Sequence, residues 1–268
     1  MAKLDVAPGE HLYYEYDEAG ATGKTFVFVN ALTGDTSMWQ SQIAPALRSA
    51  GYGTLCFNFR GQAKSECHED TRLTPDLIVD DLVHIIDRLA PKNPVLVGLS
   101  IGGLFAAQAH LAGARSIGLV LINTLRKRSR RLEWINRAMV DLAHRGGTRL
   151  LLTANAPMLV NPEFLAGLWE STFSDEPFVP MAPNDGLFRL MQESLNADWD
   201  LPYERLDVPV LLMTGRHDRV FRIDADVAEL SARIQDAREI VYPDAGHLIP
   251  VERPAQFEQD LAAFAEQL

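Results

Sequence analysis

Three residues of this sequence have the types and the order that nucleophilic acyl chemistry requires. Ser100 lies in the stretch GLSIGG, Asp218 in GRHD and His247 in DAGH. A serine hydroxyl is a weak nucleophile near neutral pH, and it becomes effective when a histidine takes its proton and a carboxylate orients that histidine. The sequence therefore predicts a catalytic triad of Ser100, His247 and Asp218.

The residues around Ser100 predict a sharp turn between a strand and a helix. Residues 94–100, PVLVGLS, form an apolar strand pattern, and residues 102–113, GGLFAAQAHLAG, are typical of an apolar helix. Gly98 and Gly102 leave room for the two elements to approach closely, so that Ser100 would stand above the carboxyl edge of the sheet. The simpler alternative is a structural turn that needs glycine for its backbone angles and gives the serine no chemical role.

The predicted acid and base each follow an apolar run. Asp218 comes shortly after PVLLMTG, residues 209–215, and His247 comes shortly after REIVYPD, residues 238–244. Parallel strands end at a common edge of their sheet, which is where α/β proteins place their sites. Asp244 is an alternative acid because it is close to His247 in the sequence.

Acyl transfer also needs N–H groups directed at the oxygen that becomes negative. The first predicted donor is the backbone N–H of Ile101, next to the nucleophile. The second is predicted in the loop VNALTGDTSMW, residues 29–39, and we assign it to Leu32. The alternative is that this loop is an ordinary glycine-containing connection.

The elements that would position these residues alternate along the chain. Buried strands are predicted for six runs, which are TFVFVN (25–30), GTLCFNF (53–59), PVLVGLS (94–100), IGLVLIN (117–123), PVLLMTG (209–215) and REIVYPD (238–244). Amphipathic helical stretches separate them, and continuous apolar strands imply helices on both faces of the sheet. The predicted fold class is α/β, with a doubly wound, mostly parallel sheet.

One segment interrupts this alternation. Residues 125–203 contain no strand of the buried type and read as helical pieces separated by several prolines. We interpret residues 125–203 as a helical cap, and residues 1–124 with 204–268 as the core.

The cap begins with the basic run LRKRSRR, residues 125–131, in a chain whose formal net charge is −11. Arg126 and its neighbours could attract a carboxylate-bearing substrate, or they could form a solvated helix face. Asn30, Trp169 and Phe188 are further candidate substrate contacts, although aromatic residues in a cap often form its own small core.

Composition excludes several classes of function. The acidic balance argues against binding to nucleic acid or anionic membranes. The N-terminal residues contain no apolar signal region, so a cytoplasmic location is expected. Cys56 and Cys67 do not have the spacing of metal ligands, and neither a metal nor a cofactor is expected. The predicted partner is a small-molecule substrate, and the oligomeric state is open.

Together, GLSIGG, GRHD, DAGH and the terminal ERPAQFEQDLAAF resemble the α/β-hydrolase superfamily over nearly the whole chain. The chain order Ser, Asp, His is the order that this topology imposes. Asn30 and Ala31 stand where most members have His-Gly, and NALTG is similar to the loop of 3-oxoadipate enol-lactone hydrolases. NFRGQAKS departs from the usual Asp-x-Arg-Gly-His-Gly at Asn58, Gln62 and Ala63.

This resemblance implies a serine hydrolase that cleaves a small carboxylic ester or lactone through an acyl-enzyme on Ser100. Three alternatives stay open. The chain could hydrolyse a C–C bond in a ring-cleavage product, transfer an acyl group to an acceptor other than water, or bind a ligand without catalysis.

Overall fold

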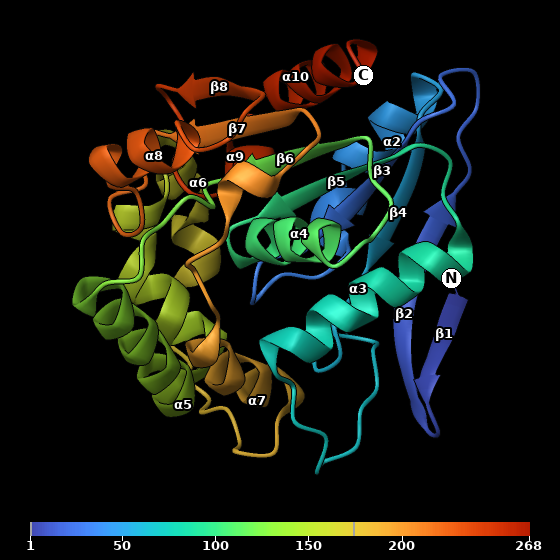
Figure 1. Ribbon diagram of the computed structural model, residues 1–268. Helices are drawn as coiled ribbons and strands as arrows, with labels where there is room; N and C mark the ends of the chain where they lie inside the picture. The colour runs from blue at the N-terminus through green and yellow to red at the C-terminus, as the bar shows by residue number, and fades with distance from the viewer. Residues whose placement is uncertain (1, 174) are drawn as a thin grey trace.

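A single sheet forms the centre of the protein. The computed structural model describes residues 2–173 and 175–268, and in these residues eight strands are hydrogen-bonded in the order β1-β2-β4-β3-β5-β6-β7-β8 (Figure 1). The pairs β1·β2 and β2·β4 are antiparallel and the remaining pairs are parallel. The strands are β1 (Ala2–Ala7), β2 (Glu10–Asp17), β3 (Thr25–Val29), β4 (Gly53–Phe57), β5 (Pro94–Leu99), β6 (Gly118–Ile122), β7 (Val210–Gly215) and β8 (Ala237–Tyr242).

Successive side chains of the central strands pack alternately into two separate hydrophobic cores, one on each face of the sheet. Val27 and Val29 of β3 point into one core, whereas Phe26 and Phe28 point into the other. Both faces of such a strand are buried, which is why its sequence is apolar without interruption. The helices that cover the sheet or follow its strands are α1 (Ser37–Gln40), α2 (Ile43–Ser49), α3 (Pro75–Leu89), α4 (Ile101–Leu111), α8 (Asp224–Ser231), α9 (Ile249–Glu252) and α10 (Pro254–Glu266).

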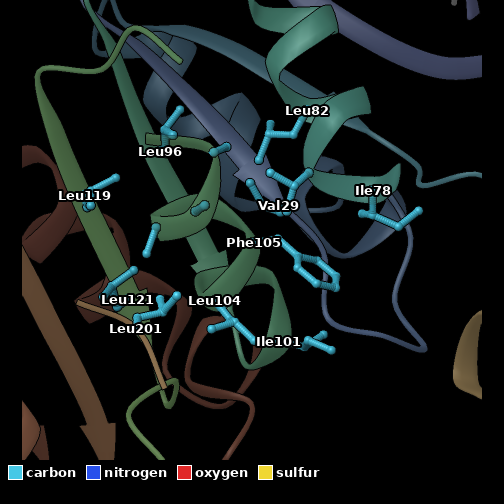
Figure 2. Packing of buried hydrophobic residues seen from close by; sticks show 14 of the residues in the cluster. Val29, Ile78, Leu82, Leu96, Ile101, Leu104, Phe105, Leu119, Leu121 and Leu201 are labelled. Carbon is cyan, nitrogen blue, oxygen red and sulfur yellow. The ribbon is translucent and has the colours of Figure 1, made fainter. Parts of the chain in front are cut away.

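The first core lies beneath α3, α4 and α8. Figure 2 shows side chains of α3 (Ile78, Leu82) and α4 (Leu104, Phe105) gathered on the same face of the sheet as Val29 and Leu96, with the Phe105 ring directed toward Ile78. The second core lies on the opposite face, where Trp39, α2 and α10 pack against the sheet. This arrangement confirms the predicted α/β class with a doubly wound, mostly parallel sheet.

The N-terminal hairpin explains why the sheet is only mostly parallel. Strands β1 and β2 were not predicted from the sequence, because neither is a continuous apolar run: β1 alternates between half-buried and exposed residues, and β2 has charged residues at both ends. The alternation in β1 is typical of an antiparallel edge strand that faces solvent on one side. The two strands extend the sheet beyond β4.

Helices fill the long connection between β6 and β7. They are α5 (Arg130–Leu159), α6 (Pro162–Thr172) and α7 (Gly186–Glu193), followed by the short 3₁₀ helices η1 (Ser194–Asn196) and η2 (Tyr203–Arg205). In Figure 1 they lie together beside the sheet. Helix α5 is broken at Gly146 and Gly147, where Gly147 has a φ of 67°. The division of the chain into a core and a cap over residues 125–203 stays a prediction.

A buried ion cluster holds the antiparallel edge to the core. Arg60 donates from Nε and Nη2 to both oxygens of Asp81, at 2.8 and 2.6 Å, and from Nη1 to Glu10. Glu10 lies on β2 and Asp81 on α3, so one guanidinium joins three segments of the chain. Because two carboxylates surround it, this buried positive charge is fully compensated.

The first prediction concerns this cluster. We expect Arg60→Met to lower the free energy of unfolding by about 3–5 kcal/mol, because it leaves two buried carboxylates without their counter-ion. Urea denaturation measures the change. The matched control is Arg72→Met, which removes an exposed arginine paired with Glu193 at 3.1 Å and should cost less than about 1 kcal/mol. Equal effects of the two variants would contradict the assignment.

Candidate active site

Ser100 occupies a strained turn between β5 and α4. Its φ is 61° and its ψ is −121°, a conformation that residues with a side chain rarely adopt. The turn is held by neighbouring strand β6: the Ser100 N–H donates to Ile122 O at 2.8 Å, and Thr124 Oγ1 donates to Ser100 O at 3.1 Å. The backbone strain is therefore maintained by tertiary hydrogen bonds on both sides of the residue.

The two glycines beside Ser100 are required by close backbone packing. A Cβ on Gly98 would lie 2.4 Å from Gly102 C, and a Cβ on Gly102 would lie 2.4 Å from Asn30 O. Both distances are shorter than any real contact of such an atom. The predicted strand–turn–helix geometry is thus present, and it brings the loop after β3 against the beginning of α4.

His247 and Asp218 form a buried pair. His247 Nδ1 lies 2.6 Å from Asp218 Oδ2, and Asp218 Oδ1 accepts from the N–H groups of Val220 and Phe221 at 3.2 and 2.9 Å. Burial alone would raise the pKa of Asp218, but the His247 ring, these hydrogen bonds and the charge of Arg126 together lower it. An ionised carboxylate only accepts, so Nδ1 carries the proton and Nε2 is left as a proton acceptor.

The loop after β3 is held by buried amide side chains. Asn30 Nδ2 donates to Gln62 Oε1 at 3.0 Å, and Trp39 Nε1 donates to Asn30 Oδ1 at 2.8 Å. Gln62 Nε2 in turn donates to Ala31 O and Leu32 O at 2.9 and 3.1 Å. Asn58 belongs to the same network, since its Oδ1 accepts from Asn30 Nδ2 at 3.2 Å, so two of the residues that distinguish NFRGQAKS shape this loop.

The network leaves two backbone donors free beside Ser100. Leu32 and Ile101 both line the cavity that contains Ser100. Within the part of the chain that the structure describes, neither of their N–H groups has an acceptor. Free N–H groups at this place are what an oxyanion site requires.

Arg126 contacts Ser100 directly. Its Nη2 donates to Ser100 Oγ at 2.7 Å and to Asn123 O at 3.0 Å, and its Cζ lies 3.8 Å from the Phe221 ring centroid. The side chain is buried, and burial lowers its pKa to about 10, so that it stays protonated at neutral pH. The interpretation of this residue as part of a solvated face is wrong. The charged residues that follow it, from 127 to 131, are partly or fully exposed.

These residues surround a cavity of about 520 Å³. Its wall combines the candidate catalytic groups with apolar side chains from α5, α7 and the following segment. The lining includes Leu32, Ser100, Ile101, Arg126, Met139, Val140, Leu151, Leu152, Leu159, Met191, Leu195, Trp199, Phe221, His247 and Leu248.

Three predicted substrate contacts do not line this cavity. Asn30 is fully buried in the amide network, because its side chain is needed to hold the loop. Trp169 on α6 is 60% exposed and packs against Phe173. Phe188 is buried in a small core with Val140, so its ring stabilises the helices instead of reaching the cavity. The assignment of these three residues as substrate contacts is therefore not supported.

Two positioning residues were missed from the sequence. Asn123, with a φ of 47°, donates from Nδ2 to Gly246 O and His247 O at 3.0 Å and accepts from Gly215 N at 3.0 Å. It therefore joins β6 to the loops that carry both Asp218 and His247. A polar residue that ends an apolar strand was the only sequence signal for it.

Glu252 is the second positioning residue that was missed from the sequence. Its Oε2 accepts from the N–H and Nδ2 of Asn161 at 2.8 and 2.9 Å and from Gly246 N at 2.8 Å, and its Oε1 accepts from Leu248 N at 2.9 Å. This buried carboxylate thus holds the backbone on both sides of His247 and joins it to the start of α6.

Comparison with known proteins identifies the family. The model of the alpha/beta hydrolase family matches residues 26–260. The chain belongs to this family. The 3-oxoadipate enol-lactonase 1 of Acinetobacter baylyi is 26% identical over 245 residues, covering 90% of this chain and 88% of the relative.

Solved structures share the α/β-hydrolase fold along the whole chain. An esterase from Exiguobacterium antarcticum superposes with a TM-score of 0.80 at 19% identity and 98% coverage of both chains. The enol-lactonase from Burkholderia xenovorans LB400 gives 0.76 at 24% identity, with 95% of this chain and 96% of that one covered. The predicted resemblance to the superfamily, and to its enol-lactonases, is confirmed.

Two further features are absent from the described residues. No helix among them is long and apolar enough to cross a membrane. They also contain no group of three or more His, Cys, Asp or Glu residues placed to hold a metal ion.

The second prediction concerns Glu252. Glu252→Gln places an amide NH₂ against N–H donors, so we expect the free energy of unfolding to fall by about 1–3 kcal/mol. Hydrogen exchange should become faster in the peptide that contains residues 244–252. The control is Glu266→Gln, at an exposed position of α10. Unchanged protection around His247 in Glu252→Gln would show that the carboxylate does not hold this loop.

Proposed function

We propose that this α/β-hydrolase cleaves a small carboxylic ester or lactone through an acyl-enzyme on Ser100. The observation that carries the proposal is a single cavity lined by Ser100, His247, Leu32 and Ile101. Within it, a buried carboxylate orients the histidine and two backbone N–H groups are free. Nucleophile, base and oxyanion donors are the complete set of groups that acyl transfer to a serine needs.

In the proposed reaction, His247 Nε2 takes the proton of Ser100 while Oγ attacks the carbonyl carbon. The N–H groups of Leu32 and Ile101 stabilise the tetrahedral oxyanion. Protonated His247 then gives its proton to the leaving alkoxide, and Asp218 stabilises the imidazolium. Water activated by the same histidine hydrolyses the acyl-enzyme. In the structure Ser100 Oγ accepts a hydrogen bond from Arg126. The hydroxyl must therefore first turn toward His247 by rotation about the Cα–Cβ bond of Ser100.

The relatives support an ester or lactone substrate. The enol-lactonase of Acinetobacter baylyi is similar along most of the chain, and the esterase of Exiguobacterium antarcticum shares the fold. A cavity of about 520 Å³ with a mostly apolar wall suits a small acyl group. We propose further that residues 125–203 act as a cap, since α5 and α7 contribute much of this wall. The cytoplasmic location stays a prediction from the N-terminal composition.

The third prediction tests the nucleophile. Wild type should hydrolyse members of a panel of p-nitrophenyl esters and simple lactones, and Ser100→Ala should lose this turnover. A fluorophosphonate should label Ser100, as located by mass spectrometry. Labelled Ser100 without turnover would favour a C–C bond or a different acyl acceptor. An unlabelled Ser100 would overturn the proposal in favour of ligand binding without catalysis.

The fourth prediction separates the two candidate acids. Asp218→Asn should reduce kcat by roughly 1,000- to 10,000-fold, because the amide favours the wrong tautomer of His247. Asp244→Asn should change kcat less than about threefold, since Asp244 lies at the surface and pairs with Arg253 Nε at 2.7 Å. Steady-state kinetics on the best ester of the panel measures both. The reverse ranking would make Asp244 the acid.

A further inference from the structure

We propose that Arg126 binds a carboxylate of the substrate next to the scissile carbonyl group. This inference rests on the proposed hydrolase function and deepens it, because it names the substrate class as short acyl groups or lactones that carry a carboxylate. It is carried by the environment of one guanidinium group.

Arg126 is a buried positive charge that no carboxylate in the described part of the chain contacts directly, and Asp218 acts on it only from beyond ion-pair distance. Its exposed fraction is 5%, and no carboxylate of the described residues lies within ion-pair distance of it. Arg60 shows the usual solution to the same problem, because it is equally buried but contacts both Glu10 and Asp81. Burying an unpaired charge is costly, and an anionic ligand would offset this cost when it binds.

The cavity wall has the charge that such a ligand requires. Although the whole chain has a formal net charge of −11, the described residues that line the cavity include no Asp or Glu. They do include Arg126 and Arg149. Asp218 does not line the cavity, and its Oδ2 is hydrogen-bonded to His247, which does. An anionic substrate in this cavity would thus be attracted by the arginines and would face no carboxylate of the lining.

The free donors of Arg126 suit a carboxylate. Of the five guanidinium N–H groups, the two on Nη2 bond to Ser100 Oγ and Asn123 O. Nε is without a partner, and no described residue accepts from Nη1. A carboxylate that binds the Nη1–Nη2 edge would compete with Ser100 for Nη2. Binding of the anion would therefore release Ser100 Oγ, which could then turn toward His247.

The position of Arg126 limits the length of the acyl group. Nη2 is 2.7 Å from Ser100 Oγ, and Oγ is the atom that attacks the carbonyl carbon. A carboxylate bound to Nη2 must then lie only one to three methylene groups from that carbon. Monoesters of malonate, succinate and glutarate meet this condition.

The kinetic test compares substrates of matched size. Methyl hydrogen succinate carries the carboxylate, and methyl succinamate replaces it with a neutral amide. We expect wild type to prefer the anion in kcat/KM, and Arg126→Met to reduce the ratio of the two kcat/KM values by about 100-fold. Arg130→Met is the matched control, because it removes a 97% exposed charge from the same basic run and should leave the ratio unchanged.

A binding test removes the dependence on turnover. In Ser100→Ala, malonate, succinate or glutarate should raise Tm, and the shift should vanish in the double variant Ser100→Ala/Arg126→Met. Tm without ligand checks folding, and it should not fall in Arg126→Met, because an apolar group replaces an unpaired buried charge. Arg126→Lys is a second variant, which keeps the charge but loses the two-pronged geometry, and it should show a reduced shift.

The outcomes separate the two proposals. Ser100-dependent hydrolysis with an unchanged substrate ratio in Arg126→Met would overturn the carboxylate site and leave the hydrolase standing. An Arg126-dependent Tm shift without any Ser100-dependent turnover would support the anion site and contradict the hydrolase. The absence of a Tm shift with all three dicarboxylates would overturn the site.

Discussion

The close approach of α4 to the end of β3 is the constraint on which the rest of the site depends. Gly102 lies against the carbonyl groups of Val29 and Asn30 so closely that no side chain fits between them. This contact brings the N–H of Ile101 and the loop that contains Leu32 to the same side of Ser100. The unusual backbone angles of Ser100 are a consequence, since the chain must turn within one residue from the strand into the helix.

Buried polar side chains convert this local turn into a site assembled from distant segments. Gln62 and Asn30 shape the loop after β3, Asn123 joins β6 to the loops after β7 and β8, and Glu252 holds the backbone around His247. Loops are the least constrained parts of a fold, and catalytic groups need precise positions. These side chains make several hydrogen bonds to backbone groups of the loops and so restrict the conformations that the loops can adopt.

The two buried arginines, Arg60 and Arg126, differ in the groups that surround their positive charges. Arg60 is surrounded by Glu10 and Asp81, and the resulting cluster joins three segments of the core. Arg126 contacts neutral oxygens and aromatic rings, and its charge is opposed only by the more distant Asp218. Burying a charge with so little compensation is costly, and the anionic substrate that we propose would offset part of this cost when it binds.

The sequence by itself determined the class of the fold and the order of Ser100, Asp218 and His247. Continuous apolar runs identify strands covered on both faces, because burial of a whole strand affects every residue in it. Glycine at 98 and 102 identifies a sharp turn, because the close contact is between residues that are near each other in the chain. The hairpin of β1 and β2 was missed because an exposed antiparallel edge has a weaker pattern.

Tertiary structure alone decided which polar residues meet. In the sequence Arg126 is one member of a basic run that could be exposed. In the fold, the segment after β6 packs against the loops after β5 and β7, so that Arg126 is buried between Ser100 and Phe221. Asn30, Trp169 and Phe188 were assigned by residue type. Trp169 packs against Phe173, only four residues away, and stays exposed, whereas the positions of Asn30 and Phe188 depend on Gln62 and Val140, which are distant in the sequence. Contacts between residues far apart in the sequence leave no periodic signal, so these partners could be found only in the folded chain.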